Sequence, residues 1–211
     1  MIIGAGGHGR EVLDVVNAIN AVEPTFKMIG FLADRDGAHE PLIRQPVGII
    51  GPTSLLETLD ADYIVAIGNP DARAEIDQRC MRMGRSSPVL IHPGAGVGSD
   101  VHLGPGSVVM AGARITTNLV AGRSLQVNVN ATISHDARIG NYVTISPGCN
   151  ISGNVELADS VYLGTGCVII PGVRIGAKTM VGAGAVVVND LPSDITAVGV
   201  PAKPLVRGAS D

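Results

Sequence analysis

Apolar residues recur at every sixth position through the second half of the chain. Counting in sixes from Ile91 to Val181 gives sixteen positions, of which fifteen hold Ile, Leu or Val and one holds Ala121. Four places after each of them comes an uncharged residue no larger than leucine. Short strands with inward aliphatic side chains, a turn every six residues and no helix between them predict a β-helical solenoid.

The first ninety residues follow a different pattern, in which short apolar runs alternate with amphipathic ones. Two of the apolar runs are followed by helical spacing, which indicates strand-to-helix returns and a small parallel βαβ domain. The predicted elements are strands at residues 2–3, 28–32, 63–67 and 89–91 and helices through residues 12–19 and 71–83.

These two patterns give the fold class and the domain organisation. We expect a β protein with a small α/β domain, in which a Rossmann-like unit (residues 1–88) precedes the β-helix (residues 89–190). Residues 191–211 form a C-terminal segment. The last strand of the first unit runs directly into the first hexad, so no flexible linker is expected.

Composition excludes several other classes of protein. The 211 residues include 28 glycines but only five aromatic residues, which suits a narrow prism with no room for rings. Fourteen of the sixteen glycines between residues 91 and 186 fall one or three places after the repeated aliphatic, where we expect turns with backbone angles open mainly to glycine. Only 16% of residues are charged, which argues against disorder.

Charge and hydropathy patterning also limit the partners. A formal charge of −4 without a basic run, and few aromatic residues for base stacking, argue against a nucleic-acid partner. No apolar stretch reaches the roughly 18 residues that span a bilayer, so no membrane partner is expected. The three cysteines lack CxxC spacing and predict neither a zinc site nor a disulfide framework. No basic segment precedes Gly4, so we expect a cytoplasmic location.

A glycine-rich segment lies between the first strand and the first helix. Gly4, Gly6 and Gly9 satisfy G-x-G-x-x-G, and Asp34 follows about 25 residues later. Such glycines let the backbone approach a pyrophosphate at a helix N-terminus. About 85 residues form only half of a dinucleotide fold, which favours a nucleoside diphosphate; an NAD site and a purely structural turn remain as alternatives.

The combination of G-A-G-G-H-G (residues 4–9), F-L-A-D (31–34), A-I-G-N (66–69) and the hexad prism is more specific. It resembles the hexapeptide-repeat sugar acetyltransferases related to sialic acid O-acetyltransferases and UDP-4-amino-sugar N-acetyltransferases, over nearly the whole chain. The resemblance implies a left-handed parallel β-helix, acetyl-CoA as co-substrate, no metal and a nucleotide-linked amino sugar as partner. It also implies a homotrimer with active sites between subunits.

The same resemblance assigns the substrate-binding residues. The glycine-rich segment would contact the diphosphate, Asp34 the ribose or base, the A-I-G-N segment the other side of the nucleotide, and Asn128 the acceptor sugar. Many relatives have two aspartates where this chain has Ala33-Asp34, which leaves the base open. The substrate-binding residues are Gly6, Gly7, His8, Asp34, Gly68, Asn69 and Asn128.

His135 is the predicted general base. It stands in Ile-Ser-His-Asp, two places after an inward aliphatic, and matches the catalytic histidine of the family. An amine that attacks a thioester must lose a proton, which imidazole accepts near neutral pH. Asp136 would orient the ring, and the N–H of Gly153, one 18-residue coil further on, would stabilise the oxyanion. Thr144 replaces a second family histidine and cannot act as a base.

The likeness also places the cofactor at several positions along the prism. Lys203 in the Gly-Val-Pro-Ala-Lys ending would meet a CoA phosphate. The cofactor-binding residues implied by the family are Thr144, Gly153, Thr165, Ala183, Pro201 and Lys203.

The leading hypothesis is acetyl transfer from acetyl-CoA to the amino group of a nucleotide-linked 4-amino-4,6-dideoxy sugar, by direct attack in a ternary complex. The alternatives are a sialic acid O-acetyltransferase and a non-catalytic nucleotide-binding hexapeptide protein. A γ-type carbonic anhydrase on the same prism needs three imidazoles around a metal. Gly140 stands where one of those histidines would be, and His102 lies about two coils away from His135.

Overall fold

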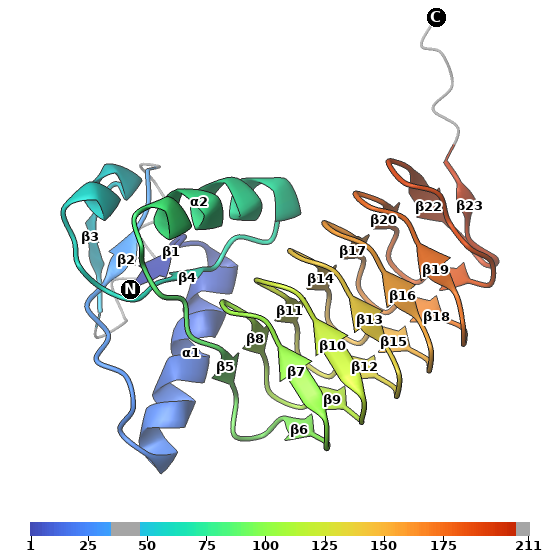
Figure 1. The fold of residues 1–211 in the computed structure, drawn as a ribbon, viewed down its shortest axis with the longest axis horizontal. Coiled ribbons are helices and arrows are strands. Elements are labelled where there is room, and N and C mark those ends of the chain that lie inside the picture. The colour runs from blue at the N-terminus through green and yellow to red at the C-terminus, as the bar shows by residue number, and fades with distance from the viewer. Residues whose placement is uncertain (35–46, 206–211) are drawn as a thin grey trace, which may run out of the picture.

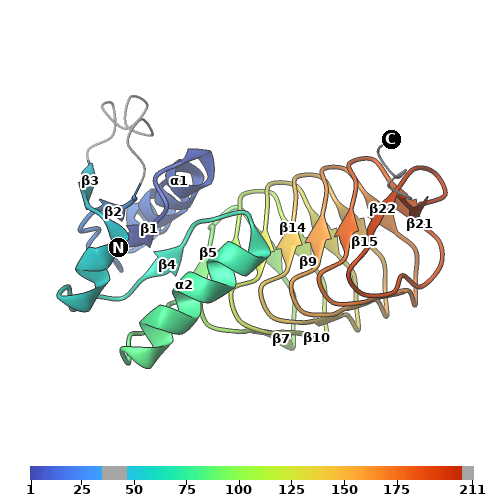
Figure 2. The same cartoon turned by 90° about the horizontal axis from the view of Figure 1, so that it is seen from above.

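The computed structural model describes residues 1–34 and 47–205. A unit with two long helices packs at one end of a long triangular prism (Figures 1 and 2). This architecture confirms the predicted fold class. Neither long helix within the described residues combines the length and hydropathy of a membrane span.

The N-terminal unit is built on a four-stranded parallel sheet with strand order β3-β2-β1-β4. The strand β3 and the 3₁₀ helix after it were not predicted, because this strand is short and lies between glycines and a proline. The elements are β1 (Ile2–Ile3), α1 (Gly7–Val22), β2 (Phe31–Leu32), β3 (Ile49–Gly51), the 3₁₀ helix (Thr53–Glu57), β4 (Ile64–Val65) and α2 (Pro70–Arg82).

The two helices form for different local reasons. Helix α1 buries Val12, Leu13 and Val16 at helical spacing, and these side chains pack against the sheet. Helix α2 is much more polar, and interactions at its N-terminus stabilise it. The Asn69 side chain accepts a hydrogen bond from the N–H of Ala72 at 3.0 Å, and a proline occupies the first turn.

The prism consists of three sheets, whose strands up to Val187 run parallel and pair with the strand 18 residues later. Gln126 pairs with Thr144 and Val127 with Ile145, for example. At the end of the chain Met180 pairs with Thr196, and Lys203 pairs antiparallel with Val198. Sheet I contains β5 (Leu90–Ile91), β8 (Val108–Val109), β11 (Gln126–Val127), β14 (Thr144–Ile145), β17 (Tyr162–Leu163), β20 (Met180–Val181), β22 (Thr196–Val198) and β23 (Lys203–Pro204). Sheet II contains β6 (Gly96–Val97), β9 (Arg114–Ile115), β12 (Thr132–Ile133), β15 (Asn150–Ile151), β18 (Val168–Ile169) and β21 (Val186–Val187). Sheet III contains β7 (Val101–Leu103), β10 (Leu119–Ala121), β13 (Arg138–Ile139), β16 (Glu156–Leu157) and β19 (Arg174–Ile175).

Every predicted inward aliphatic is the last residue of a strand. From Val109 to Val181 these side chains are at most 7% exposed and form one continuous core. The hexad register is therefore confirmed, with three hexads per coil.

The glycines of the repeat serve two purposes, and the prediction explained only one of them. Three places after the aliphatic the backbone is left-handed, with φ of 68° at Gly148 and 61° at Asp136. One place after the aliphatic the φ is ordinary, but a Cβ on Gly140 would lie 2.6 Å from the backbone nitrogen of Asp159 in the next coil. At that second place, glycine permits close stacking of the coils rather than an unusual turn.

The N-terminal unit shares a core with the first coils of the prism. Val12 and Val16 of α1 belong to the same buried cluster as Leu90, Val108 and Met110. The domain boundary at residue 88 stays a prediction, since the first prism strand packs with the preceding unit.

Candidate active site

His135 and Asp136 form a hydrogen-bonded pair at the corner between sheets II and III. The Nδ1 atom of His135 lies 2.7 Å from Oδ2 of Asp136, and the His135 side chain is 56% exposed. Asn118, one coil earlier, donates to the other carboxylate oxygen at 3.2 Å. The hydrogen bonds from His135 and then Asn118 hold the pKa of Asp136 below its usual value. The ionised Asp136 carboxylate accepts a hydrogen bond from the N–H at Nδ1 of His135, so the other ring nitrogen, Nε2, carries the lone pair.

The imidazole of His135 lies over Gly153 of the next coil. A Cβ on residue 153 would lie 2.5 Å from Cε1 and 2.7 Å from Nε2 of His135. Gly153 stands two places after its aliphatic, where neither the left-handed turn nor the stacking of coils requires glycine. At this position the ring of His135 occupies the space of a Cβ, so the residue must be glycine.

The backbone N–H of Gly153 is available as a donor. Its carbonyl accepts from Gly172 at 3.0 Å, and the N–H of the next residue, Asn154, bonds the His135 carbonyl at 2.9 Å. Within residues 1–34 and 47–205, no acceptor takes the N–H of Gly153 itself. The corner therefore places a free N–H donor in the residue directly beneath the imidazole.

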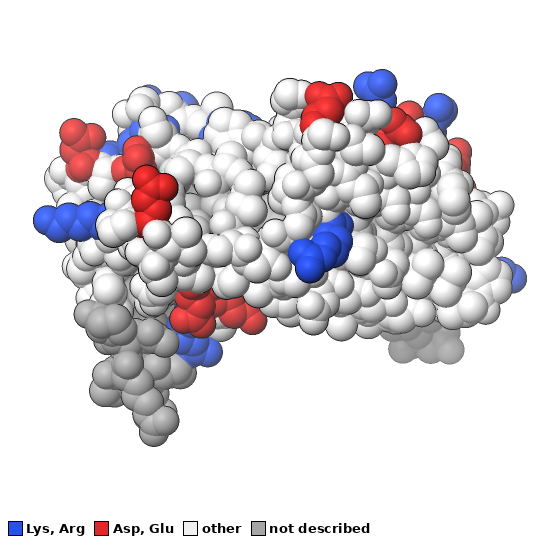
Figure 3. Space-filling model, turned by 90° about the horizontal axis from the view of Figure 1, so that it is seen from below, with Lys and Arg blue, Asp and Glu red and all other residues white. Residues whose placement is uncertain are grey.

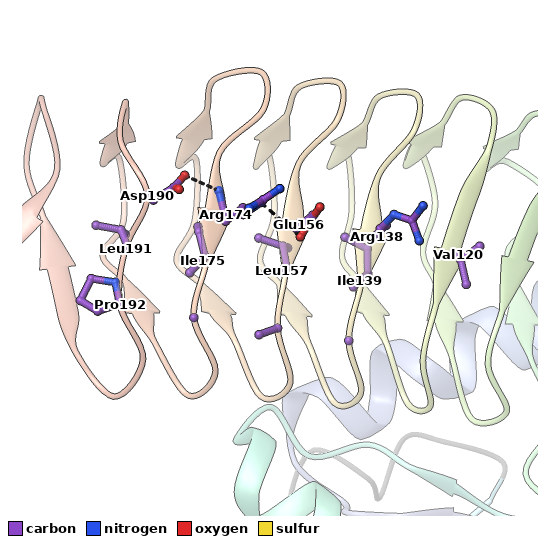
Figure 4. A pocket seen from close by; sticks show the side chains of 13 residues that line it. Val120, Arg138, Ile139, Glu156, Leu157, Arg174, Ile175, Asp190, Leu191 and Pro192 are labelled. Atoms are coloured by element: carbon purple, nitrogen blue, oxygen red, sulfur yellow. Dashed lines mark hydrogen bonds and ion pairs between the residues drawn. The ribbon is translucent and has the colours of Figure 1, made fainter.

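Two adjoining hollows lie beside this corner. A polar one of about 470 Å³ is lined by Asp136 and Asn154, and it shares Arg138, Glu156 and Arg174 with a groove of about 620 Å³ along sheet III. Figure 4 shows these charged side chains in one row above apolar ones, with Arg174 3.4 Å from Glu156. A long ligand could lie along this surface from the His135 corner.

A second cavity, of about 710 Å³, lies in the N-terminal unit at the start of α1. The first N–H groups of a helix lack partners within the helix and favour a phosphate or other anion. Six of the seven predicted substrate-binding residues line this one cavity: Gly6, Gly7, His8, Asp34, Gly68 and Asn69.

Asp34 is held at the edge of this cavity by a residue that the sequence did not reveal. Its carboxylate accepts bonds from the N–H of Thr53 at 2.7 Å and from the Thr53 hydroxyl at 2.6 Å. These bonds lower the pKa of Asp34. Thr53 lies in the unpredicted 3₁₀ helix, so nothing in the sequence pattern placed it here.

His8 and Asn69 line the cavity, and each already makes a hydrogen bond within the protein. His8 Nδ1 is 3.3 Å from Glu11, and its Nε2 atom is buried without a partner among the described residues. Burial, aided by the charge of Arg73, lowers the pKa of His8, so the ring is neutral at pH 7. The side-chain oxygen of Asn69 caps α2, and this structural role was not predicted.

Comparisons with known proteins agree with this geometry. Residues 1–80 match the family model described as the PglD N-terminal domain. The acetyltransferase domain of PglB from Neisseria gonorrhoeae is 38% identical, with a TM-score of 0.89 over 97% of this chain and 98% of that one. The chain belongs to the hexapeptide-repeat sugar acetyltransferases. This confirms the family predicted from the sequence.

Two further members of this acetyltransferase family are similar. PerB from Caulobacter crescentus, solved with CoA and GDP-perosamine, is 34% identical, with a TM-score of 0.86 and coverage of 97% and 95% of the two chains. The curated UDP-N-acetylbacillosamine N-acetyltransferase of Bacillus subtilis is 32% identical over 111 residues. That match spans 52% of this chain and half the length of the curated relative.

Several predicted residues lie away from the His135 corner of this acetyltransferase prism. Asn128, Thr165 and Ala183 lie at the next corner, between sheets I and II, one prism face away. Thr165 and Ala183 are both exposed. They lie in successive coils, one above the other, where the N–H of Gly184 donates to the Thr165 carbonyl at 2.9 Å. Two further exposed residues, Pro201 and Lys203, lie in the terminal turn and strand next to β22.

Thr144 lies in the junction between the two units, and its contact with the cofactor stays a prediction. It is 3% exposed on sheet I, where its hydroxyl donates to the Gly68 carbonyl at 3.1 Å and accepts from Arg73 at 2.9 Å. These contacts join the prism to the N-terminal unit. They give no support to a contact between Thr144 and the cofactor.

The prediction also missed a polar network at the junction of the two units. Asp77 is 1% exposed and accepts bonds from Arg123 at 3.0 Å, Tyr63 at 2.6 Å and Tyr142 at 2.9 Å. Burial raises the pKa of Asp77, but these donors outweigh it and hold the pKa below its usual value. Arg73 and Asp77 stand one helical turn apart on the polar helix α2, and this spacing was the available signal.

The described residues contain no group of three or more histidine, cysteine, aspartate or glutamate side chains placed to hold a metal ion.

Proposed function

We propose that this chain transfers acetyl from acetyl-CoA to the amino group of a nucleotide-linked amino sugar. The observation that carries the proposal is the stack of His135 over Gly153, with Asp136 on the other ring nitrogen. It supplies a base with a free lone pair and a free N–H donor in one open corner. Relatives solved with acetyl coenzyme A, or with CoA and GDP-perosamine, support this choice of substrates.

The chemistry requires one proton acceptor and one oxyanion donor. The sugar amine would attack the thioester carbonyl while Nε2 of His135 takes its proton, forming the C–N bond and a tetrahedral oxyanion. The N–H of Gly153 would stabilise that oxyanion. Breaking the C–S bond releases the CoA thiolate, which recovers the proton from His135. Because the amine attacks the thioester directly, this route has no acyl-enzyme intermediate; the three cysteines are buried.

The nucleotide would occupy the cavity at the start of α1. Its diphosphate meets the N–H groups of Gly7 and His8 at a helix N-terminus. Since His8 is neutral, it contributes a hydrogen bond rather than a charge. The carboxylate of Asp34, oriented by Thr53, suits a ribose hydroxyl.

A homotrimer completes this proposal. His135 and the predicted cofactor residues Thr165 and Ala183 lie on different corners of the prism, so a cofactor that touches both suits the space between two chains. The prism surface seen from below is largely uncharged (Figure 3), and Arg114 is the one charged outward side chain on the strands of sheet II. Such a surface can be covered by a second copy. A cytoplasmic location stays a prediction.

Turnover with a panel of acceptors tests the proposed function. The acceptors are UDP-, GDP- and dTDP-linked 4-amino-4,6-dideoxy sugars and free sialic acid, each with acetyl-CoA and with thiol release as the readout. We expect turnover of at least one nucleotide-linked amino sugar and its N-acetylated product by mass spectrometry. Turnover of sialic acid alone would identify an O-acetyltransferase, and acetyl-CoA binding without any turnover would indicate a non-catalytic protein.

A further inference from the structure

We propose that Arg73 is a positioning residue that fixes the nucleotide cavity relative to the prism carrying His135. This inference rests on the proposed function, because it concerns how the acceptor sugar is delivered to the base. It assigns a task to a side chain that does not itself line the nucleotide cavity and lies away from the His135 corner.

Arg73 is an arginine with no exposed surface, and it bonds both units of the molecule at once. Its Nη1 atom donates to the carbonyls of Ile67 at 2.7 Å and Gly68 at 3.2 Å. On the prism it donates to Ser124 O (3.2 Å), Gln126 Oε1 (3.1 Å), Tyr142 O (2.6 Å) and Thr144 Oγ1 (2.9 Å).

The acceptors on the first side belong to the wall of the nucleotide cavity. Ile67 and Gly68 both line it, and the Asn69 cap of α2 follows immediately. The acceptors on the other side come from two successive coils, around β11 and β14. One planar guanidinium thus holds the cavity wall against two coils, and a change in its position moves the wall relative to the prism.

No other side chain type fits this set of acceptors. Five N–H groups in a rigid plane reach six oxygens in different directions, whereas a lysine offers three donors from one atom. All six acceptors are uncharged oxygens, and none is a carboxylate. Burial lowers the pKa of Arg73 to about 10, so the group remains charged at pH 7. Charged donors to neutral acceptors make strong bonds.

The expected consequence concerns the acceptor more than acetyl-CoA. A sugar anchored by its nucleotide reaches His135 correctly only if the cavity is correctly placed, and misplacement by about 1 Å can cost about 10²-fold in rate. The contacts of Arg73 do not involve the His135 corner, the neighbouring hollows or the exposed column of Thr165 and Ala183.

The test compares Arg73→Lys with Arg82→Lys, a matched change on the exposed end of the same helix. We expect kcat/KM for the nucleotide-linked amino sugar to fall at least tenfold in Arg73→Lys. The Kd for acetyl-CoA, measured by calorimetry, should stay within twofold of wild type. Arg82→Lys should change neither quantity. A fall of less than tenfold, or an equal loss of acetyl-CoA affinity, would overturn the positioning role.

A measurement that needs no turnover separates this proposal from the proposed function. Hydrogen–deuterium exchange should be faster in Arg73→Lys over residues 64–72 and unchanged over the distant coils 150–187. Unchanged exchange over residues 64–72 would overturn the role of Arg73 even if the enzyme is active. Failure of the wild type to turn over any nucleotide-linked amino sugar would instead count against the proposed function.

Discussion

The imidazole of His135 occupies the space that a side chain at Gly153 would need. A Cβ at residue 153 would come within 2.5 to 3.0 Å of three ring atoms of His135. Contacts this short force one group to move, and the Gly153 backbone is held in the coil, so the exposed ring is the group that yields. The position of the base therefore depends on glycine one coil away.

Gly153→Ala tests this relationship. The added methyl group should displace the His135 ring and lower kcat by about 10²-fold, since proton transfer by a positioned base contributes roughly 10²–10⁴-fold. Steady-state thiol release gives the rate, and circular dichroism confirms the fold. Gly48→Ala is the matched control, because a Cβ there meets no atom of residues 1–34 and 47–205 within 4 Å. Equal rates in Gly153→Ala and wild type would contradict the stacking account.

The buried Asp77 should make the stability of the junction depend on pH. Its pKa is lowered in the folded chain, so its contribution is present above the usual value of 3.8 and is lost as the pH falls through the folded-state value. Asp77→Asn leaves Arg123 without its charge partner and should lower the free energy of unfolding at pH 7 by about 3 kcal/mol. Urea unfolding from pH 7 to pH 3 measures both.

The difference between wild type and Asp77→Asn should shrink below pH 4, as wild-type Asp77 itself becomes protonated. Glu57→Gln is the control, since Glu57 pairs with Arg79 at the exposed surface and such pairs contribute little. A difference that stays constant from pH 7 to pH 3 would show that the charge of Asp77 is not what stabilises the junction.

Asp34 should determine nucleotide affinity. Asp34→Ala removes the carboxylate from the cavity and should weaken nucleoside diphosphate binding about tenfold, the effect of one hydrogen bond to a charged group. Because the bonds from Thr53 lower the pKa of Asp34, wild-type affinity should not change through titration of Asp34 between pH 5 and 8. Calorimetry with UDP, GDP and dTDP measures this.

Thr53→Val should have a smaller effect on the same affinities, about threefold, because it removes the hydroxyl bond at 2.6 Å and keeps the backbone bond at 2.7 Å. Affinities within twofold of wild type for Asp34→Ala with all three nucleotides would remove Asp34 from the nucleotide site.

The proposed trimer is tested by sedimentation equilibrium at micromolar concentration. The mass should be three times the 21.5 kDa of the chain. A monomer that turns over acetyl-CoA normally would contradict an active site shared between chains.

The sequence predicted the prism well because one local rule repeats. A single period located the buried aliphatic residues at the strand ends from Val109 to Val181, and a spacing of 18 located Gly153 one coil from His135. The family resemblance, rather than the period, assigned the six substrate-binding residues that line one cavity. They lie together because loops that follow parallel strands meet at one edge of a sheet.

What could not be predicted depends on contacts between units that do not repeat. Thr144 belongs to the hexad pattern, but only the packing of α2 shows that Arg73 and Gly68 cover it. Arg73 and Asp77 resemble ordinary surface residues of a polar helix, since their partners on the prism lie between 46 and 71 residues away in sequence. Their burial follows from docking on the prism, which local periodicity does not report.

The central claim is that His135 accepts the proton of the acceptor amine. The most direct measurement is kcat of His135→Ala with acetyl-CoA and the nucleotide-linked amino sugar used by wild type, followed by thiol release, with acetyl-CoA affinity measured in parallel. We predict a loss of about 10²–10⁴-fold in kcat with acetyl-CoA affinity retained. A loss of less than tenfold would contradict the assignment of His135 as the base.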